Sequence, residues 1–143
     1  MWDRQTIVEK IRDSADKYGD SNPQQMKQLL FGCEKASERE LFFGVFSFYY
    51  DPELQENSFA RQEVAGKILF KLKPACPVEL DGFIYAIPKY WNLSIEEVPW
   101  YLCKVFGKNE VEAFLKELIP SVNDGELQRS FKTLLFWVKN YNA

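Results

Sequence analysis

The side chains that most enzymes use for acid–base and metal chemistry are sparse in this sequence. The chain has no histidine, which excludes catalysis by imidazole and metal binding through imidazole. Its three cysteines, Cys33, Cys76 and Cys103, are widely spaced and form no C-x-x-C motif, which favours buried, reduced thiols in a cytoplasmic protein. Because the sequence also lacks G-x-x-x-x-G-K-[ST] and G-x-G-x-x-G, it predicts no phosphate-binding loop and no cofactor.

Carboxylates are the remaining groups that could do chemistry. They occur as three close pairs: Glu79 and Asp81, Glu96 and Glu97, and Glu110 and Glu112. Residues one or two positions apart point in different directions on a helix, and most of these acids fall in predicted first turns, where they favour the helix dipole. We therefore predict no catalytic residue, no metal ligand and no enzymatic activity. A metal-dependent enzyme built from carboxylates far apart in the sequence is retained as an alternative.

Aromatic residues outside the predicted core stripes are better candidates for a functional surface. Trp100 lies roughly opposite the apolar face of its predicted helix, and acidic and aromatic residues surround it in the sequence. Protein interfaces use aromatic anchors with a charged rim. The predicted binding patch consists of Tyr90, Trp91, Glu96, Glu97, Trp100 and Tyr101. The competing interpretation is that most off-stripe aromatics, Phe59, Phe70 and Phe136 included, pack between layers of helices.

Length and charge limit the remaining classes. With 143 residues and 46% hydrophobic side chains, the chain is expected to form one domain over residues 1–143. A net charge of −3 counts against nucleic-acid binding, which depends on clustered Lys and Arg, and suits a basic partner or simply solubility. The longest apolar run, Leu41–Tyr50, is about half of the roughly 20 residues that a membrane-spanning helix needs, so no membrane segment is predicted.

The positions of any site depend on helices throughout the chain. Apolar residues recur at helical spacing in eight segments, which group as hairpins over 3–34, 38–73, 78–106 and 109–141. Predicted helix starts carry a capping residue at Asn22, Ser37, Ser58, Ser94 and Asn109. Gly19 is expected to end the first helix, and Pro88 to end or kink the helix over 78–91 near Ala86–Ile87. The aromatic run over 41–50 follows a capping box, which favours a buried helix over a strand.

The central segment, Ser58–Pro74, organises the prediction. Val64, Ala65, Ile68, Leu69 and Leu72 form one apolar stripe, and a second, thinner stripe of Phe59 and Phe70 lies roughly opposite, with Gly66 close to it. A helix that is apolar on two sides needs neighbours on both. We therefore predict that this helix is sandwiched between other helices rather than peripheral.

One hairpin, residues 38–73, resembles a HEAT-type repeat. The matching residues are Asp51-Pro52 at the end of its first helix and Arg61, Val64-Ala65 and Ile68-Leu69 in its second. The resemblance implies an all-α fold built as a short right-handed stack of antiparallel helical hairpins, a HEAT-like α-solenoid. It also implies that Asp51 and Arg61 are structural and hold one hairpin to the next. The other hairpins lack both features, and about four extra residues separate Asp51-Pro52 from the second helix.

These observations favour a non-catalytic protein-binding module, for example an inhibitor or immunity-type protein that masks a basic partner. The main alternative is a nucleic-acid-binding helical-repeat protein of the DNA-repair kind. It requires basic residues to converge on one concave face: Arg61, Lys67, Lys71, Lys73, Lys104, Arg129, Lys132 and Lys139.

Overall fold

The computed structural model describes residues 1–142, apart from the side chain of Pro88. The α-helices are α1 (Arg4–Tyr18), α2 (Pro23–Glu34), α3 (Glu38–Tyr50), α4 (Ser58–Leu72), α5 (Leu80–Ala86), α6 (Glu97–Phe106), α7 (Lys108–Leu118) and α8 (Gly125–Lys139). Three 3-10 turns join them: η1 (Pro52–Leu54), η2 (Ile87–Lys89) and η3 (Ile119–Ser121). These residues contain no β-strand, so the prediction of an all-α protein with about eight helices is confirmed, including a helix through residues 41–50.

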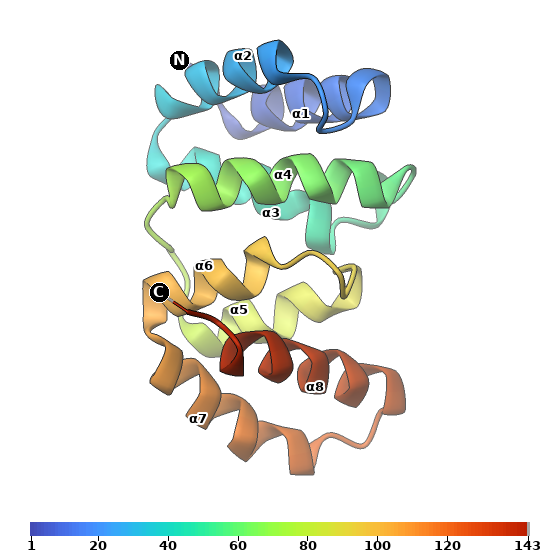
Figure 1. The fold of residues 1–143 in the computed structure, drawn as a ribbon, viewed down its shortest axis with the longest axis vertical. Coiled ribbons are helices and arrows are strands. Elements are labelled where there is room, and N and C mark those ends of the chain that lie inside the picture. Colours follow the sequence, from blue (N-terminus) through green and yellow to red (C-terminus); the bar gives the residue numbers. More distant parts are fainter. Residues whose placement is uncertain (143) are drawn as a thin grey trace.

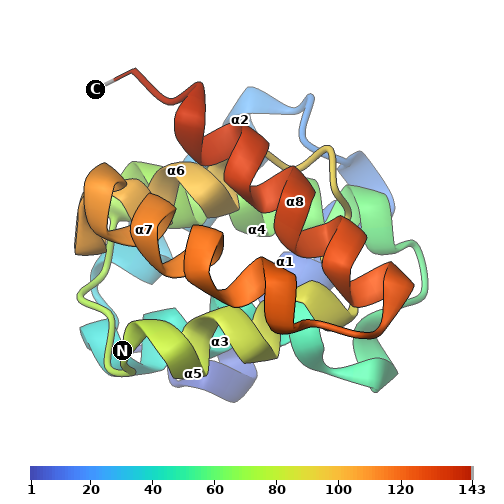
Figure 2. The same ribbon diagram turned by 90° about the horizontal axis from the view of Figure 1, so that it is seen from below.

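The helices lie as successive pairs along the long axis of the molecule, with α1 and α2 at one end and α7 and α8 at the other (Figure 1). Seen from below, α3 and α5 lie on one side of the molecule and α4 and α6 on the opposite side (Figure 2). Helix α4 contacts α1, α2 and α3 as well as α6. The central helix is therefore sandwiched between neighbours, as its sequence predicts.

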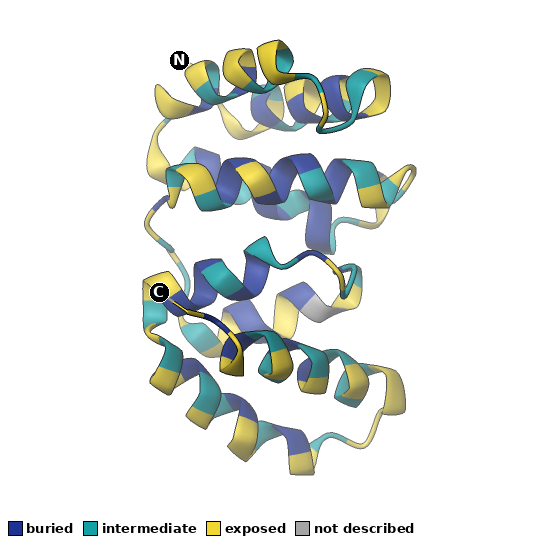
Figure 3. Ribbon diagram, viewed as in Figure 1, coloured by how far each residue is buried: buried dark blue, intermediate teal, exposed yellow. Residues whose placement is uncertain are grey.

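The two stripes of α4 differ in their burial. Val64, Ala65, Ile68 and Leu69 have no exposed surface. On the second stripe Phe70 is half-buried against Trp100, with ring centroids 5.5 Å apart, whereas Phe59 is 49% exposed. The interpretation that Phe59 packs between layers of helices is therefore wrong. Helix α6 begins only after the loop that follows η2, so it does not extend alongside the first turn of α4. The buried middle of α4 and the exposed residues of the outer helices are visible in Figure 3.

Close approach at glycines explains how α4 packs on both sides. A Cβ placed on Gly66 would lie 3.1 Å from Tyr49 Oη and 3.2 Å from Ile95 Cγ2, so α3 and the segment leading into α6 both reach the α4 backbone here. Gly44 has the same role in α3, where an added Cβ would lie 2.8 Å from Ile7 Cγ2. Glycine lowers the helix propensity at both positions, but it allows the neighbouring helices to approach more closely.

Some predicted caps form and others do not. The side chains of Asn22 and Ser37 accept from the N–H groups of Gln25 and Glu40. The capping box at Ser37 is only half formed, because the Glu40 carboxylate accepts from the backbone and guanidinium of Arg4 instead.

Three predicted caps are wrong, for local reasons. Ser58 is the first residue of α4, and Asn57 precedes it in the left-handed conformation with φ 48°. The Ser94 hydroxyl donates to Asn92 Oδ1, and α6 begins only at Glu97. Asn109 already lies inside α7, because Gly107 reverses the chain with φ 93° and the helix starts directly after it.

The helix predicted over 78–91 is shorter in the structure. Helix α5 ends at Ala86 and passes into η2, which contains Pro88. This confirms the predicted break, since proline lacks the N–H that would continue the α-helix. The consequence is that α5 has only seven residues, and the space on either side of it is not filled by a long helix.

Arg61 ties one hairpin to the preceding one, as the repeat resemblance implies. Its buried guanidinium donates to both carboxylate oxygens of Asp16 in α1, at 2.9 and 2.7 Å, and to Leu54 O. Asp51 has a local role instead, because its carboxylate accepts from the N–H of Glu53 and caps η1.

Candidate functional site

The structure divides the predicted patch around α6 into buried and accessible residues. Trp91 and Tyr101 are 4% and 0% exposed, so they cannot serve as surface anchors and this part of the prediction is corrected. The polar atom of each side chain forms a hydrogen bond inside the protein. Trp91 Nε1 donates to Ile95 O at 3.1 Å, and Tyr101 Oη donates to Pro74 O at 2.7 Å. The Tyr101 ring stacks on Phe83 of α5, with ring centroids 6.0 Å apart.

The other predicted residues remain partly accessible. Tyr90, Glu96, Glu97 and Trp100 are all half-buried. Trp100 packs on Phe70 of α4, while Tyr90 is held through its carbonyl, which accepts from Gln62 at 2.7 Å. The accessible part of the patch is therefore limited to these four half-buried residues, with Trp100 at the junction of α4 and α6.

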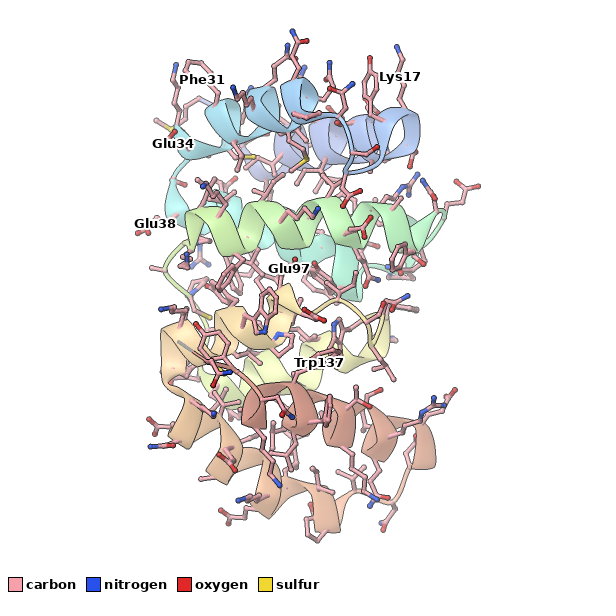
Figure 4. All side chains as sticks on the ribbon, in the orientation of Figure 1. Lys17, Phe31, Glu34, Glu38, Glu97 and Trp137 are labelled. Atoms are coloured by element: carbon pink, nitrogen blue, oxygen red, sulfur yellow. The ribbon has the colours of Figure 1, made fainter. Side chains whose placement is uncertain are left out.

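The same junction carries a compact cluster of charges. Lys67 of α4 pairs with Asp20 in the turn between α1 and α2, and the Lys67 hydrogen bond lowers the pKa of Asp20. Burial, and then the neighbouring Asp20 carboxylate, raise the pKa of Glu63, and burial raises the pKa of Glu97. Glu97 lies between α4 and α6 in Figure 4. This cluster links three layers of the fold, which is sufficient to explain its shifted acids.

The carboxylate-based alternative needs a cluster of metal-ligating side chains. Within residues 1–142, no three His, Cys, Asp or Glu side chains lie close enough together to hold a metal ion. Cys33 and Cys103 are buried, Cys76 is half-buried, and all three thiols are free. None of the helices described here has both the length and the hydrophobicity needed to cross a bilayer.

An acidic groove between α5 and α7 is the feature that the sequence prediction missed. It is shallow and wide open to solvent, has a volume of about 720 Å³, and is lined by Glu79, Leu80, Asp81, Asn109, Glu110, Ala113, Phe114 and Glu117. The α7 residues recur at helical spacing, which is the signal that marks them as one face. In the described part of the chain, none of these four carboxylates takes part in an ion pair.

The two acids at the start of α5 do little to cap that helix. Asp81 accepts from the N–H of Gly82 at 2.8 Å, whereas Glu79 occupies the N-cap position of α5 without capping it through its side chain. Leu80 and Phe114 are half-buried and provide an apolar floor. A floor of this kind with a charged rim is the composition of a protein-binding surface.

A second groove lies on the other side of α5, between α5 and α3. It has a volume of about 450 Å³, and nearly all the surface exposed in it is apolar. Among its lining residues, Lys89 is the one with a charged side chain. The short helix α5 therefore separates an acidic groove from an apolar one.

The basic residues of the nucleic-acid alternative do not all remain available. Arg61 is 5% exposed and paired with Asp16, and Lys67 is paired with Asp20. A buried guanidinium cannot reach a phosphate, so the complete predicted set cannot converge on one face.

The sequence and the fold were also compared with known proteins. No protein-family model, curated protein or solved structure matches the chain. The resemblance of residues 38–73 to a HEAT-type repeat therefore has no family match behind it, and the fold described above carries the functional argument alone.

Proposed function

We propose that this protein is a non-catalytic binding module that masks a basic protein partner, and that the groove between α5 and α7 is its contact surface. The observation that carries this proposal is the concentration of charge. Glu79, Asp81, Glu110 and Glu117 supply four carboxylates to one groove, in a chain whose net charge is only −3. Carboxylates without an ion-pair partner are available to a cationic surface.

Electrostatic complementarity of this kind acts mainly on encounter. A focused negative field raises the association rate with a cationic partner and rejects acidic ones. The apolar floor of Leu80 and Phe114 would then supply the contact that holds the complex. An inhibitor or immunity-type protein needs this combination, because it must capture a basic toxin or enzyme quickly and retain it.

The proposal includes the architecture: a HEAT-like, right-handed stack of antiparallel hairpins. Contacts between successive pairs, such as α1 with α3 and α4 with α6, support it, as does the link from Arg61 to the preceding hairpin. Scaffolds that stack helix pairs present extended binding surfaces. With its free thiols, the chain is best suited to the reducing environment of the cytoplasm.

The test uses a charge-only change in the groove. Protein from the native cell is captured on the wild type, on a Glu110→Gln/Glu117→Gln variant and on a Glu34→Gln/Glu53→Gln control, whose exposed acids lie on α2 and η1. We expect one basic partner that the wild type and the control retain and the groove variant loses. Its association rate should fall by about tenfold or more between low and high salt.

Two results would contradict the proposal. One is a captured partner that the groove variant retains as well as the control does. The other is an association rate that salt leaves unchanged, because attraction between unpaired surface charges is screened at high ionic strength.

A further inference from the structure

The apolar groove between α3 and α5 is independent of the acidic one. Its floor consists of aromatic rings from both helices: Phe42 and Phe46 from α3 and Phe83 from α5. The Phe46 and Phe83 rings pack edge to face, with centroids 4.7 Å apart. Tyr85 on its rim is 59% exposed. A concave site lined mostly by apolar and aromatic side chains, with few polar groups, has the usual composition of a small-molecule site.

Gly82 lines the groove at a position where packing does not require glycine. It is an exposed residue in the middle of α5 and lines the groove, and a Cβ added to it would meet nothing within 4 Å. Packing therefore does not require this glycine, unlike Gly44 and Gly66, although glycine weakens a helix. A larger residue here would enter the groove rather than clash with the core.

Three basic side chains line the groove or lie over one of its lining rings. Lys89 is the last residue of η2 and lines the groove beside Tyr50, the last residue of α3, and η2 packs against α3. Phe43, another lining residue, carries the guanidinium groups of Arg4 and Arg39 over its ring at 4.6 and 5.0 Å. None of the lining residues that the structure describes carries a carboxylate.

We propose that this groove binds an anionic amphiphile, a long-chain carboxylate, with its hydrocarbon chain between α3 and α5 and its carboxylate at Lys89. The volume of about 450 Å³ lies within the range of small-molecule sites. Lys89 is chosen for the carboxylate because it lines the groove, whereas Arg4 is held by Glu40 at 2.7 Å. Tyr50 also lines the groove, and its hydroxyl is a further hydrogen-bond donor.

The experiment uses 11-(dansylamino)undecanoic acid as a fluorescent probe, below its micellar concentration, on the full chain. We expect saturable binding of one probe per protein and displacement by octanoate, decanoate and dodecanoate. Affinity should rise about three- to fourfold for each added methylene, since each buried CH₂ contributes a similar increment. Displacement that does not depend on chain length would overturn the proposal.

Variants locate the site. Gly82→Trp and Ala86→Trp each place an indole in the groove and should lower probe affinity about tenfold or more, whereas Gly82→Ala should retain it. Lys89→Gln should weaken dodecanoate about tenfold and leave dodecanol unchanged, because only the carboxylate loses a charged hydrogen bond.

A control excludes non-specific adsorption. Phe136→Ser removes an aromatic side chain that is 56% exposed on α8 and should leave probe binding intact. Circular dichroism melts establish that each variant is folded.

The proposal is wrong if both tryptophan variants bind the probe like the wild type, or if Lys89→Gln weakens the binding of dodecanoate and of dodecanol alike. It is also wrong if the wild type binds no probe and Gly82→Trp disrupts a complex of this protein with a protein partner. The groove would then accept a side chain of that partner rather than a long-chain carboxylate.

Discussion

Arg61 is the residue on which the link between the first two hairpins depends. Its side chain is 6% exposed, and the Asp16 carboxylate that neutralises it is 39% exposed. Removing one member of such a pair leaves a desolvated charge without its partner, which costs more than the intact pair contributes. The interaction is therefore a structural constraint, and Arg61 is unsuited to contact a ligand.

Replacing Asp16 by Asn should destabilise the protein by about 1–3 kcal/mol, because the buried guanidinium loses its charged acceptor. The matched control is Asp13→Asn, which removes a surface partner of Arg12 that is 72% exposed and should cost at most about 0.5 kcal/mol. Urea unfolding followed by circular dichroism measures both. Equal losses would place the Arg61 pair among ordinary surface pairs.

The same variant has a predicted dependence on pH. Hydrogen bonds from Arg61 hold the pKa of Asp16 below its ordinary value of 3.8, so the unfolded chain takes up this proton at a higher pH than the folded protein does. The stability that the pair contributes is fully present above that ordinary value and is lost as the pH falls through the folded-state pKa. The stability gap between wild type and Asp16→Asn should therefore narrow on acidification below about pH 4. Urea titrations from pH 7 to pH 3 test this, and a constant gap would contradict it.

The three thiols should differ in reactivity. Burial raises the pKa of Cys33 to about 12 and that of Cys103 to about 11, while Cys76 is only half-buried. Because the thiolate is the reactive species, iodoacetamide should alkylate Cys76 first and the other two only when the protein opens. Mass spectrometry of peptides over a time course measures the order. Early labelling of Cys33 would contradict the packing of α2.

At the scale of elements, α4 and α5 behave in opposite ways. Helix α4 is enclosed by α1, α2, α3 and α6, and its glycine permits close approach. Helix α5 is short and has a groove on either side, and its glycine faces open space. The same residue type thus serves packing in one helix and access in the other.

Alanine at the two glycines should therefore shift stability in opposite directions. Gly66→Ala puts a methyl group 3.1–3.3 Å from Tyr49, Ile95 and Glu97 and should cost about 1–3 kcal/mol by overpacking. Gly82→Ala meets no neighbour and should stabilise by about 0.4–1 kcal/mol through the unfolded chain. Thermal melts of both variants decide the signs, and a stabilised Gly66→Ala would mean that α6 can move away from α4.

At the scale of the whole molecule, one hydrophobic core runs through the described helices. Buried residues from α1 through α8 belong to a single connected cluster. The carbonyl of Tyr141 accepts a hydrogen bond from Lys108 Nζ at 2.9 Å, which holds the C-terminal segment against α7. Trp137 of α8 donates to Leu93 O at 2.8 Å in the loop before α6, in the region where Figure 4 labels it. These contacts connect the last pair of helices to the middle of the molecule.

The continuous core predicts a single unfolding transition. Leu69→Ala in α4 and Leu134→Ala in α8 both truncate side chains without exposed surface, and each should cost about 2–5 kcal/mol. Both should shift the same transition, with circular dichroism and tryptophan fluorescence coinciding. A second phase that only Leu134→Ala moves would mean that the last pair of helices unfolds independently, as stacked helical arrays sometimes do.

The sequence alone determined the features that depend on neighbours along the chain. The eight helices, the Asn22 cap, the break at Pro88 and the buried stripe of α4 follow from helical spacing, from capping geometry and from the missing N–H of proline. Each of these needs only a few consecutive residues, so each can be predicted without knowing the fold.

Only the tertiary structure decided which side chains reach solvent. Tyr101 is buried because the Pro74 carbonyl accepts its hydroxyl, and the Glu40 carboxylate leaves its capping box because Arg4 lies nearby. The grooves on either side of α5 exist because a seven-residue helix cannot fill the space between two longer ones. These outcomes depend on pairs of residues far apart in the sequence, and spacing along one helix contains no information about them.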